Sequence, residues 1–162
     1  MWNKRNYFDM QKLIIGIDPD CEKSGLCVIN KSEKRVMRAE ALPFPELIEA
    51  VLLLQFPGDI ECVYVEAGWL NKGNYHGRKG DSRALSAAKG EAVGRNAETG
   101  RKIVEMLRYH NIPTELVRPL KKVWKGTGGK ISQAEILRII PGFPKRSNQE
   151  VRDAALIAWV NC

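Results

Sequence analysis

Four acidic side chains stand where carboxylates could do chemistry. Asp18 and Glu66 each follow an apolar run, and Glu150 precedes Asp153 by three residues in a segment with helical periodicity. Carboxylates at the carboxyl ends of strands lie where open α/β sheets bind ligands. Residues three apart share one helix face. If the four converge, they form an all-oxygen site suited to Mg²⁺ or Mn²⁺, and a pair of such ions can promote a phosphoryl displacement.

Three of these acids also have a purely structural interpretation. An acidic residue is common where a strand gives way to a turn, so Asp18 and Glu66 could simply end their strands. Glu150 is also the last residue of Ser147-Asn148-Gln149-Glu150, which has the pattern of a capping box. Spacing alone leaves both interpretations open.

Asp153 is harder to explain as an ordinary surface acid. It lies on the same helical stripe as Ile157 and Val160, which are typical of a buried face. A carboxylate there needs a compensating positive charge. Because Arg152 points elsewhere on the helix, we expect a metal ion to provide it.

The chain is basic, with a formal net charge of +7 over 162 residues, which makes polyanions the first partners to consider. The surplus is concentrated in two segments, residues 69–83 and 118–130. This concentration favours contacts with nucleic-acid phosphates, although ordinary exposed lysines remain the alternative. The basic DNA-contact candidates are Lys72, Arg78, Lys79, Arg83, Arg118, Lys121, Lys122, Lys125 and Lys130.

Aromatic residues are interleaved with these basic residues. Trp69 and Tyr75 lie in the first segment and Trp124 in the second. Such rings can stack on unpaired bases. A loop tryptophan can equally be a packing anchor, so Trp69 has two possible roles.

Other kinds of site are excluded by spacing. The glycine run at residues 126–130 is not a nucleotide-binding P-loop, because Trp124 stands where the first glycine would be and Ile131 replaces the required Ser or Thr. The four cysteines form no C-x-x-C pair and the two histidines stand alone, so no zinc site is expected. We expect no nucleotide cofactor.

The apolar runs and the first residues bear on the location of the protein. No apolar run approaches the length of a membrane span. Residues 1–6 lead into no apolar signal core, so secretion is not expected. We expect a reduced, cytoplasmic protein of a bacterial or phage-infected cell, without membrane contact.

The acids and basic segments must be positioned by a predictable series of elements. Apolar runs and alternation predict five strands, and helical periodicity with caps and breakers predicts four helices. The strands are expected at 12–18, 25–30, 34–40, 60–66 and 114–117, and the helices at 45–56, 84–109, 132–140 and 148–160.

This order predicts one α/β domain over residues 1–162, with a mixed five-stranded sheet whose first three strands are antiparallel. Gly90, Gly94 and Gly100 interrupt the long helix at 84–109. Each interior glycine costs about 1 kcal/mol relative to alanine. We therefore expect a close contact there, either with the sheet or with a second subunit.

The ordered motifs resemble the RuvC family of Holliday junction resolvases, within the RNase H-like superfamily. The resemblance covers nearly the whole chain. It rests on residues 15–20 (Ile-Gly-Ile-Asp-Pro-Asp) with 24–29, on 63–66 (Val-Tyr-Val-Glu), on 118–130, and on the two acids three apart within 150–158. The chain departs from the family at Asp20, where Gly is usual, at Glu150, where Asp or His is usual, and in an extended loop at 70–83.

The resemblance implies an RNase H-like fold and a metal-dependent endonuclease that resolves four-way DNA junctions by paired symmetric nicks. It implies that Asp18, Glu66, Glu150 and Asp153 are catalytic metal ligands for Mg²⁺ or Mn²⁺. It also implies a homodimer, for which the helix around Gly90 is our candidate interface, and a Trp69 ring that enters the junction centre.

Two alternatives remain. The same site could serve an RNase H-like nuclease for other branched or hybrid nucleic acids, or the chain could bind junctions without cutting them. Acids at all four positions favour an enzyme.

Overall fold

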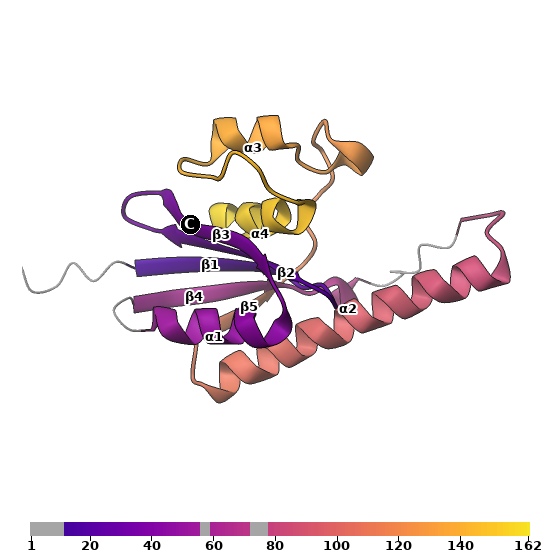
Figure 1. Ribbon diagram of the computed structural model, residues 1–162, viewed down its shortest axis with the longest axis horizontal. Helices are drawn as coiled ribbons and strands as arrows, with labels where there is room; N and C mark the ends of the chain where they lie inside the picture. Colours follow the sequence, from indigo (N-terminus) through magenta and orange to yellow (C-terminus); the bar gives the residue numbers. More distant parts are fainter. Residues whose placement is uncertain (1–11, 56–58, 72–77) are drawn as a thin grey trace, which may run out of the picture.

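The computed structural model describes residues 12–55, 59–71 and 78–162. Its centre is a five-stranded sheet with the order β3-β2-β1-β4-β5 (Figure 1). Three strands form an antiparallel meander, and the last two continue the sheet parallel to the first. The strands are β1 (Lys12–Asp18), β2 (Ser24–Asn30), β3 (Arg35–Leu42), β4 (Asp59–Glu66) and β5 (Thr114–Val117).

Helices cover both faces of the sheet. Side chains alternate between the faces along a strand, so Ile15 and Ile17 of β1 pack on the side of α1 and α2, while Ile14 packs on the side of α3 and α4. In the described parts of the chain, no helix is both long enough and apolar enough to cross a membrane. The helices are α1 (Phe44–Leu54), α2 (Arg83–Tyr109), α3 (Gln133–Ile139) and α4 (Gln149–Val160), with short 3₁₀ turns η1 (Gly68–Leu70) and η2 (Thr127–Gly129).

The predicted mixed sheet is confirmed, and its elements differ from the expected bounds by only one or two residues at most ends. The capping box at the start of α3 is also confirmed. The Oγ of Ser132 accepts the backbone N–H of Glu135, and the Glu135 carboxylate accepts the backbone N–H of Ser132.

The capping box predicted before α4 is wrong. Asn148 is the N-cap, and its side chain accepts the backbone N–H of Val151. Ser147 lies one residue outside the helix, where its hydroxyl donates to Gln133 Oε1 at 2.6 Å. Asn accepts an N-cap bond as well as Ser does, so the local pattern allowed either start. Glu150 therefore has no capping role.

Two glycines let α4 lie directly on the sheet. A Cβ on Gly25 would stand 2.0 Å from the carbonyl oxygen of Glu150, and one on Gly16 would stand 2.2 Å from that of Ala154. Only residues without a side chain allow so close an approach. Gly25 pairs with Asp18 across β1 and β2. The glycine contact therefore brings the first turn of α4 beside the end of β1.

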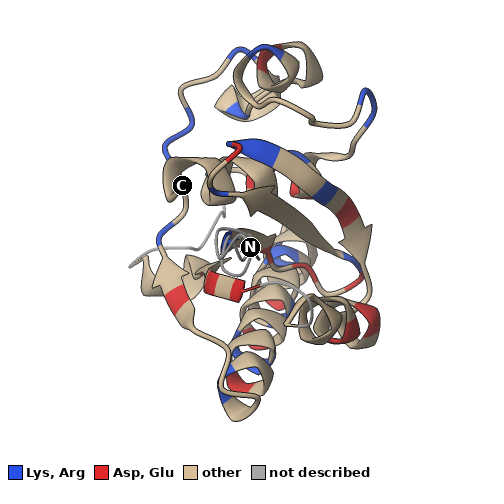
Figure 2. Cartoon of the chain, turned by 90° about the vertical axis from the view of Figure 1, so that its left-hand side faces the viewer, with Lys and Arg blue, Asp and Glu red and all other residues tan. Residues whose placement is uncertain are grey.

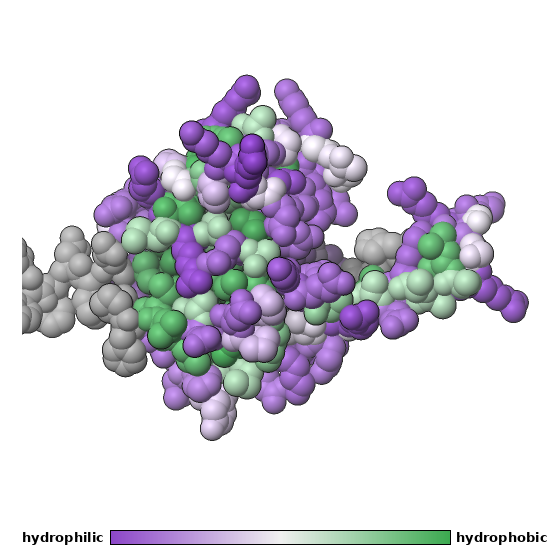
Figure 3. All heavy atoms as spheres, viewed as in Figure 1, coloured by the Kyte–Doolittle hydropathy of each residue, from purple (hydrophilic) through white to green (hydrophobic). Residues whose placement is uncertain are grey.

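The first half of α2 projects away from the body (Figures 1 and 3). We call residues 83–95 the α2 arm. No residue of the helix before Gly100 is buried. Nothing in the described chain lies within 4 Å of a Cβ built on Gly90 or Gly94. The expected contact with the sheet at these two glycines is therefore wrong, and a contact with a second subunit stays a prediction.

Candidate functional site

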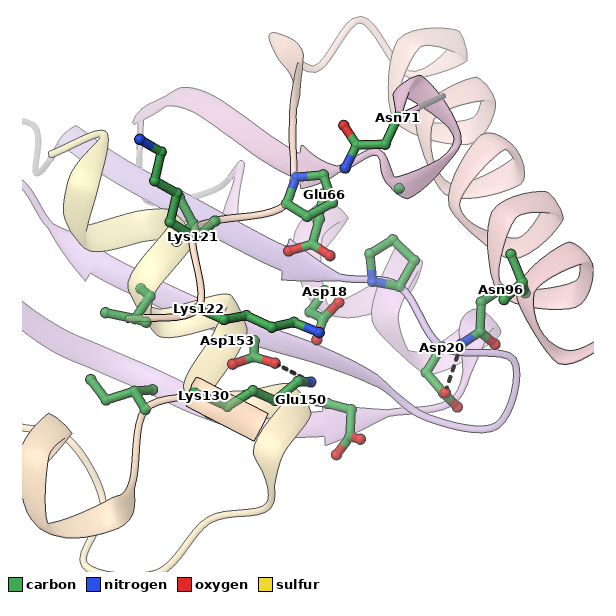
Figure 4. A pocket seen from close by; sticks show the side chains of 18 of the residues that line it. Asp18, Asp20, Glu66, Asn71, Asn96, Lys121, Lys122, Lys130, Glu150 and Asp153 are labelled. Atoms are coloured by element: carbon green, nitrogen blue, oxygen red, sulfur yellow. Dashed lines mark hydrogen bonds and ion pairs between the residues drawn. The ribbon is translucent and has the colours of Figure 1, made fainter. Parts of the chain in front are cut away.

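The structure brings the four predicted acids to one open pocket at the carboxyl end of β1 and β4 (Figure 4). Asp18 ends β1, Glu66 ends β4, and Asp153 and Glu150 come from the first turns of α4. The cavity has a volume of about 520 Å³. In Figure 4 the carboxylates of Asp18, Glu66 and Asp153 lie close together, while that of Glu150 lies at the edge of the group.

A lysine supplies positive charge to Asp153. The Nζ of Lys130 donates to Asp153 Oδ2 at 2.8 Å, and Gln149 Nε2 donates to Oδ1 at 2.7 Å. Arg152 points elsewhere, as expected, and donates to the carbonyl oxygens of Ile131 and Ser147. Sequence reasoning treated Lys130 only as a DNA contact and missed its position among the acids, because the two residues are far apart in the chain.

Burial and neighbouring negative charges raise the pKa values of two of the acids, Asp18 and Glu66. Burial raises the pKa of Asp18 well above its usual range, and the negative charges of Glu66 and Asp153 raise it further, while Lys130 opposes them. Burial and then Asp153 also raise the pKa of Glu66, against Lys130 and Lys122. Burial lowers the pKa of Lys130, but the hydrogen bond and the charge of Asp153 more than offset this. Crowded carboxylates of this kind need added positive charge.

The donor set fits Mg²⁺ or Mn²⁺ in chemical kind, because hard divalent cations prefer carboxylate oxygens. In residues 12–55, 59–71 and 78–162, however, no three Asp, Glu, His or Cys side chains are arranged closely enough to hold a metal ion. The site as arranged is a partly neutralised acidic cluster.

The glycine run at residues 126–130, which the sequence predicts not to be a P-loop, forms a compact turn. This turn places Lys130 in the pocket. The backbone N–H of Trp124 donates to Gly129 O, and that of Gly126 donates to Lys130 O, both at 2.9 Å. Gly129 has a φ of +75°, a conformation that favours glycine. A Cβ there would also stand 2.8 Å from the carbonyl oxygen of Lys122. The turn thus holds Lys122 and Lys130 on neighbouring segments of the loop.

The two basic segments occupy different places. In Figure 2 basic residues recur along the coil that connects β5 to α3. From this segment Lys121, Lys122 and Lys130 line the pocket, whereas Arg118 and Lys125 are exposed and do not.

From the other segment, Arg78, Lys79 and Arg83 are exposed at the outer end of the α2 arm. There Lys89 Nζ and the backbone N–H of Arg78 both bond the carboxylate of Asp81. The predicted contacts Lys72 and Tyr75 lie outside the described residues.

Trp69 is held against α2 at the rim of the pocket. A Cβ on Gly100 would stand 2.5 Å from Cζ3 of the ring, and the guanidinium carbon of Arg101 lies 5.4 Å from the ring centroid. The side chain is half-buried and lines the cavity. Trp69 is therefore both a packing residue and a ring available at the site. Trp124 also lines the pocket while packing on the α4 side of the sheet.

Sequence reasoning missed two polar residues that lie at the far end of the same pocket. Asp20 and Asn96 are hydrogen-bonded to each other, Asn96 Nδ2 to Asp20 Oδ2, at 3.2 Å (Figure 4). The available signal was Asp20 itself, an acid where the resembling family has glycine.

No protein-family model matches the sequence, and no curated protein matches it. Solved structures do. RuvC of Thermus thermophilus in complex with a Holliday junction substrate is 16% identical over 91% of this chain and 90% of that chain, with a TM-score of 0.54. A second RuvC structure from the same organism is 20% identical over 91% of both chains, with a TM-score of 0.48. The first match confirms at the level of fold the resemblance drawn from the motifs: this chain has the RNase H-like fold of RuvC.

Proposed function

We propose that this chain is a metal-dependent endonuclease that resolves four-way DNA junctions. The observation that carries the proposal is the pocket itself. Acids from β1, β4 and α4 meet there beside Lys121, Lys122 and the half-buried ring of Trp69. A basic rim around an acidic centre suits a phosphodiester, because the lysines attract phosphate and the acids attract divalent cations.

Asp18, Glu66, Asp153 and Glu150 would hold the cations. When bound, Mg²⁺ or Mn²⁺ would supply Lewis-acid stabilisation of charge at the phosphorus. Lys121 and Lys122, exposed on the pocket rim, bind the phosphates of the strand.

Lys130 pairs with Asp153 and offsets part of the negative charge that Asp18 and Glu66 experience. Trp69 offers a stacking surface to an unpaired base at the branch point.

Paired nicks require two such pockets, and we propose that the α2 arm pairs with that of a second copy. In a two-fold arrangement both copies would use the same face of the arm. Gly90 and Gly94 are open to solvent and allow close approach of the two backbones. A two-fold interface is self-complementary in this way.

The direct test compares four-way, forked and linear DNA of equal length, together with an RNA–DNA hybrid, in Mg²⁺ and then in EDTA. We expect paired cuts on the four-way junction, lost in EDTA and in Asp18→Asn. Preference for the fork or the hybrid would instead identify a nuclease of the same superfamily with another substrate. Cutting by Asp18→Asn at a rate near that of wild type would contradict the shared site.

One observation favours the non-cleaving alternative: Lys130 already neutralises Asp153, and the described residues hold no ready metal site. A protein that only binds junctions would retain structure-selective affinity in EDTA and show no metal-dependent cutting. The same assay, read by binding as well as by cleavage, separates the two functions.

A further inference from the structure

One amide side chain ties α2 to the turn that follows β1. Asn96 Oδ1 accepts the backbone N–H of Cys21 at 3.0 Å, and Asn96 Nδ2 donates to Asp20 Oδ2 at 3.2 Å. The other carboxylate oxygen of Asp20 accepts the backbone N–H groups of Glu22, at 2.8 Å, and Lys23. Both ends of the amide and both oxygens of the carboxylate are therefore used, so the turn and the helix hold one another in a defined orientation.

This contact lies at the inner end of the α2 arm, which we call its root. One turn further along the helix, Gly100 packs against Trp69 and Pro19. Before Asn96 no residue of α2 is buried, although Val93 still lines the pocket. The direction of the arm is thus set where α2 crosses the turn carrying Asp20, two residues beyond Asp18.

The arm acts as a lever on this root. From Asn96 to Arg83 the helix runs about 20 Å, at about 1.5 Å per residue. A tilt of about 10° at the root therefore moves the tip by about 3.5 Å. Reactive groups displaced by about 1 Å already lose much of their rate, so such a tilt is large on the scale of catalysis.

We propose that Asp20 and Asn96 are positioning residues that fix the direction of the α2 arm, and with it the spacing of the two acidic pockets in a dimer. The inference rests on the proposed function, because it assigns the arm to the contact between two copies. One pocket can engage its phosphate whatever the direction of the arm. The second pocket reaches the opposite strand only when both arms leave their bodies at the correct angle. The pair therefore controls whether the second nick follows the first.

Exchanging the two residues provides a test by rescue. In Asp20→Asn the single amide oxygen can accept either from Asn96 or from the N–H groups of Glu22 and Lys23, but not from both. In Asn96→Asp two carboxylates face each other, so each single variant breaks the network. In the double variant the new amide at position 20 can donate to the new carboxylate at position 96, which can still accept the N–H of Cys21. Glu22→Gln is the matched control, because it removes one exposed negative charge from the same turn.

The assay uses the full chain and a supercoiled plasmid that extrudes a cruciform, in Mg²⁺. Paired nicks in one binding event give linear DNA, and a single nick gives an open circle. We expect each single variant to raise the ratio of open circle to linear DNA about fivefold, equivalent to about 1 kcal/mol, the net contribution of one hydrogen bond. The exchanged double variant and Glu22→Gln should return the wild-type ratio, with all melting temperatures close to wild type.

Single variants with the wild-type ratio would overturn the inference and leave the proposed function standing. An exchanged variant as impaired as the single variants would also overturn it, because the charge of Asp20 rather than the contact would then matter. Absence of cutting by the wild-type protein would overturn the proposed function and the inference together.

Discussion

Gly100→Ala tests whether the position of the Trp69 ring matters for DNA. The new Cβ would stand 2.5 Å from Cζ3 and 2.9 Å from Cη2 of the ring, and 3.2 Å from Cγ of Pro19. Carbon atoms in contact prefer separations of about 3.5–4.0 Å, so the ring must move by about 1 Å. The substitution thus displaces Trp69 from Arg101 without changing its chemistry.

The change in the free energy of unfolding of Gly100→Ala follows from two opposing effects. Overpacking typically costs about 1–3 kcal/mol. Alanine in place of glycine inside a helix contributes about 1 kcal/mol in the other direction. We expect a net loss of about 0–2 kcal/mol in the free energy of unfolding, and a melting temperature lower by at most about 8 °C. If the ring stacks on a base at the branch point, affinity for the junction should fall by a further 1–3 kcal/mol, or about 5- to 150-fold.

The assay pairs calorimetric melting with fluorescence anisotropy on a four-way junction and a linear duplex in EDTA. Thr99→Ala, one residue before Gly100, is the control for a change on the same helix. In a Trp69→Ala background the clash disappears, so Gly100→Ala should raise stability by about 1 kcal/mol through helix propensity alone. Junction affinity equal to wild type in Gly100→Ala would refute the stacking role. Additive effects of the two substitutions on stability would refute the clash itself.

Three further variants probe the acids, the basic rim and the contact of α4 with the sheet. Asp18→Asn should abolish cutting yet raise the free energy of unfolding at pH 7.5 by about 0.5–2 kcal/mol. Because the pKa of Asp18 is raised in the folded state, the wild-type protein loses stability as pH rises through that pKa. Urea titrations should therefore show the stability advantage of Asp18→Asn over wild type vanishing near pH 4. Replacing Lys121 and Lys122 with Ala should reduce the slope of log affinity against log salt by about 1 per lost phosphate contact, and an unchanged slope would show that both are merely solvated. Gly25→Ala should cost about 3 kcal/mol in a urea melt, because its Cβ would stand 2.0 Å from Glu150 O; a wild-type midpoint would disprove the close packing of α4.

The strands and helices could be predicted from the sequence because their signals are local. The apolar run ending at Asp18, the breaker after α1 and the capping box at Ser132 each act within a few residues. The start of α4 was misplaced by one residue because Ser147 and Asn148 are both good caps, and only packing chose between them. Ser147 instead bonds Gln133, which lies 14 residues away.

The acids of the candidate site were predictable from the sequence, whereas its other members and its arrangement were not. Residue types at strand ends and on one helix face pointed to Asp18, Glu66 and Asp153, because strand ends and helix periodicity are themselves local properties. The expectation that a metal ion balances Asp153 did not anticipate Lys130, which reaches the acid through a glycine turn. No local pattern specifies which of several lysines in a basic segment reaches an acid 23 residues away.

The sequence by itself determined the order of elements, the mixed sheet and the identity of the acids, since each depends on periodicity, caps and residue type over short spans. Only the tertiary structure decided which side chains meet. The seat of α4 on Gly25, the ring of Trp69 on Gly100 and the bond between Asn96 and Asp20 all join residues distant in the chain. Such contacts form at separations of a few ångströms that depend on the packing of the whole chain, so they emerge only once the helices have docked on the sheet.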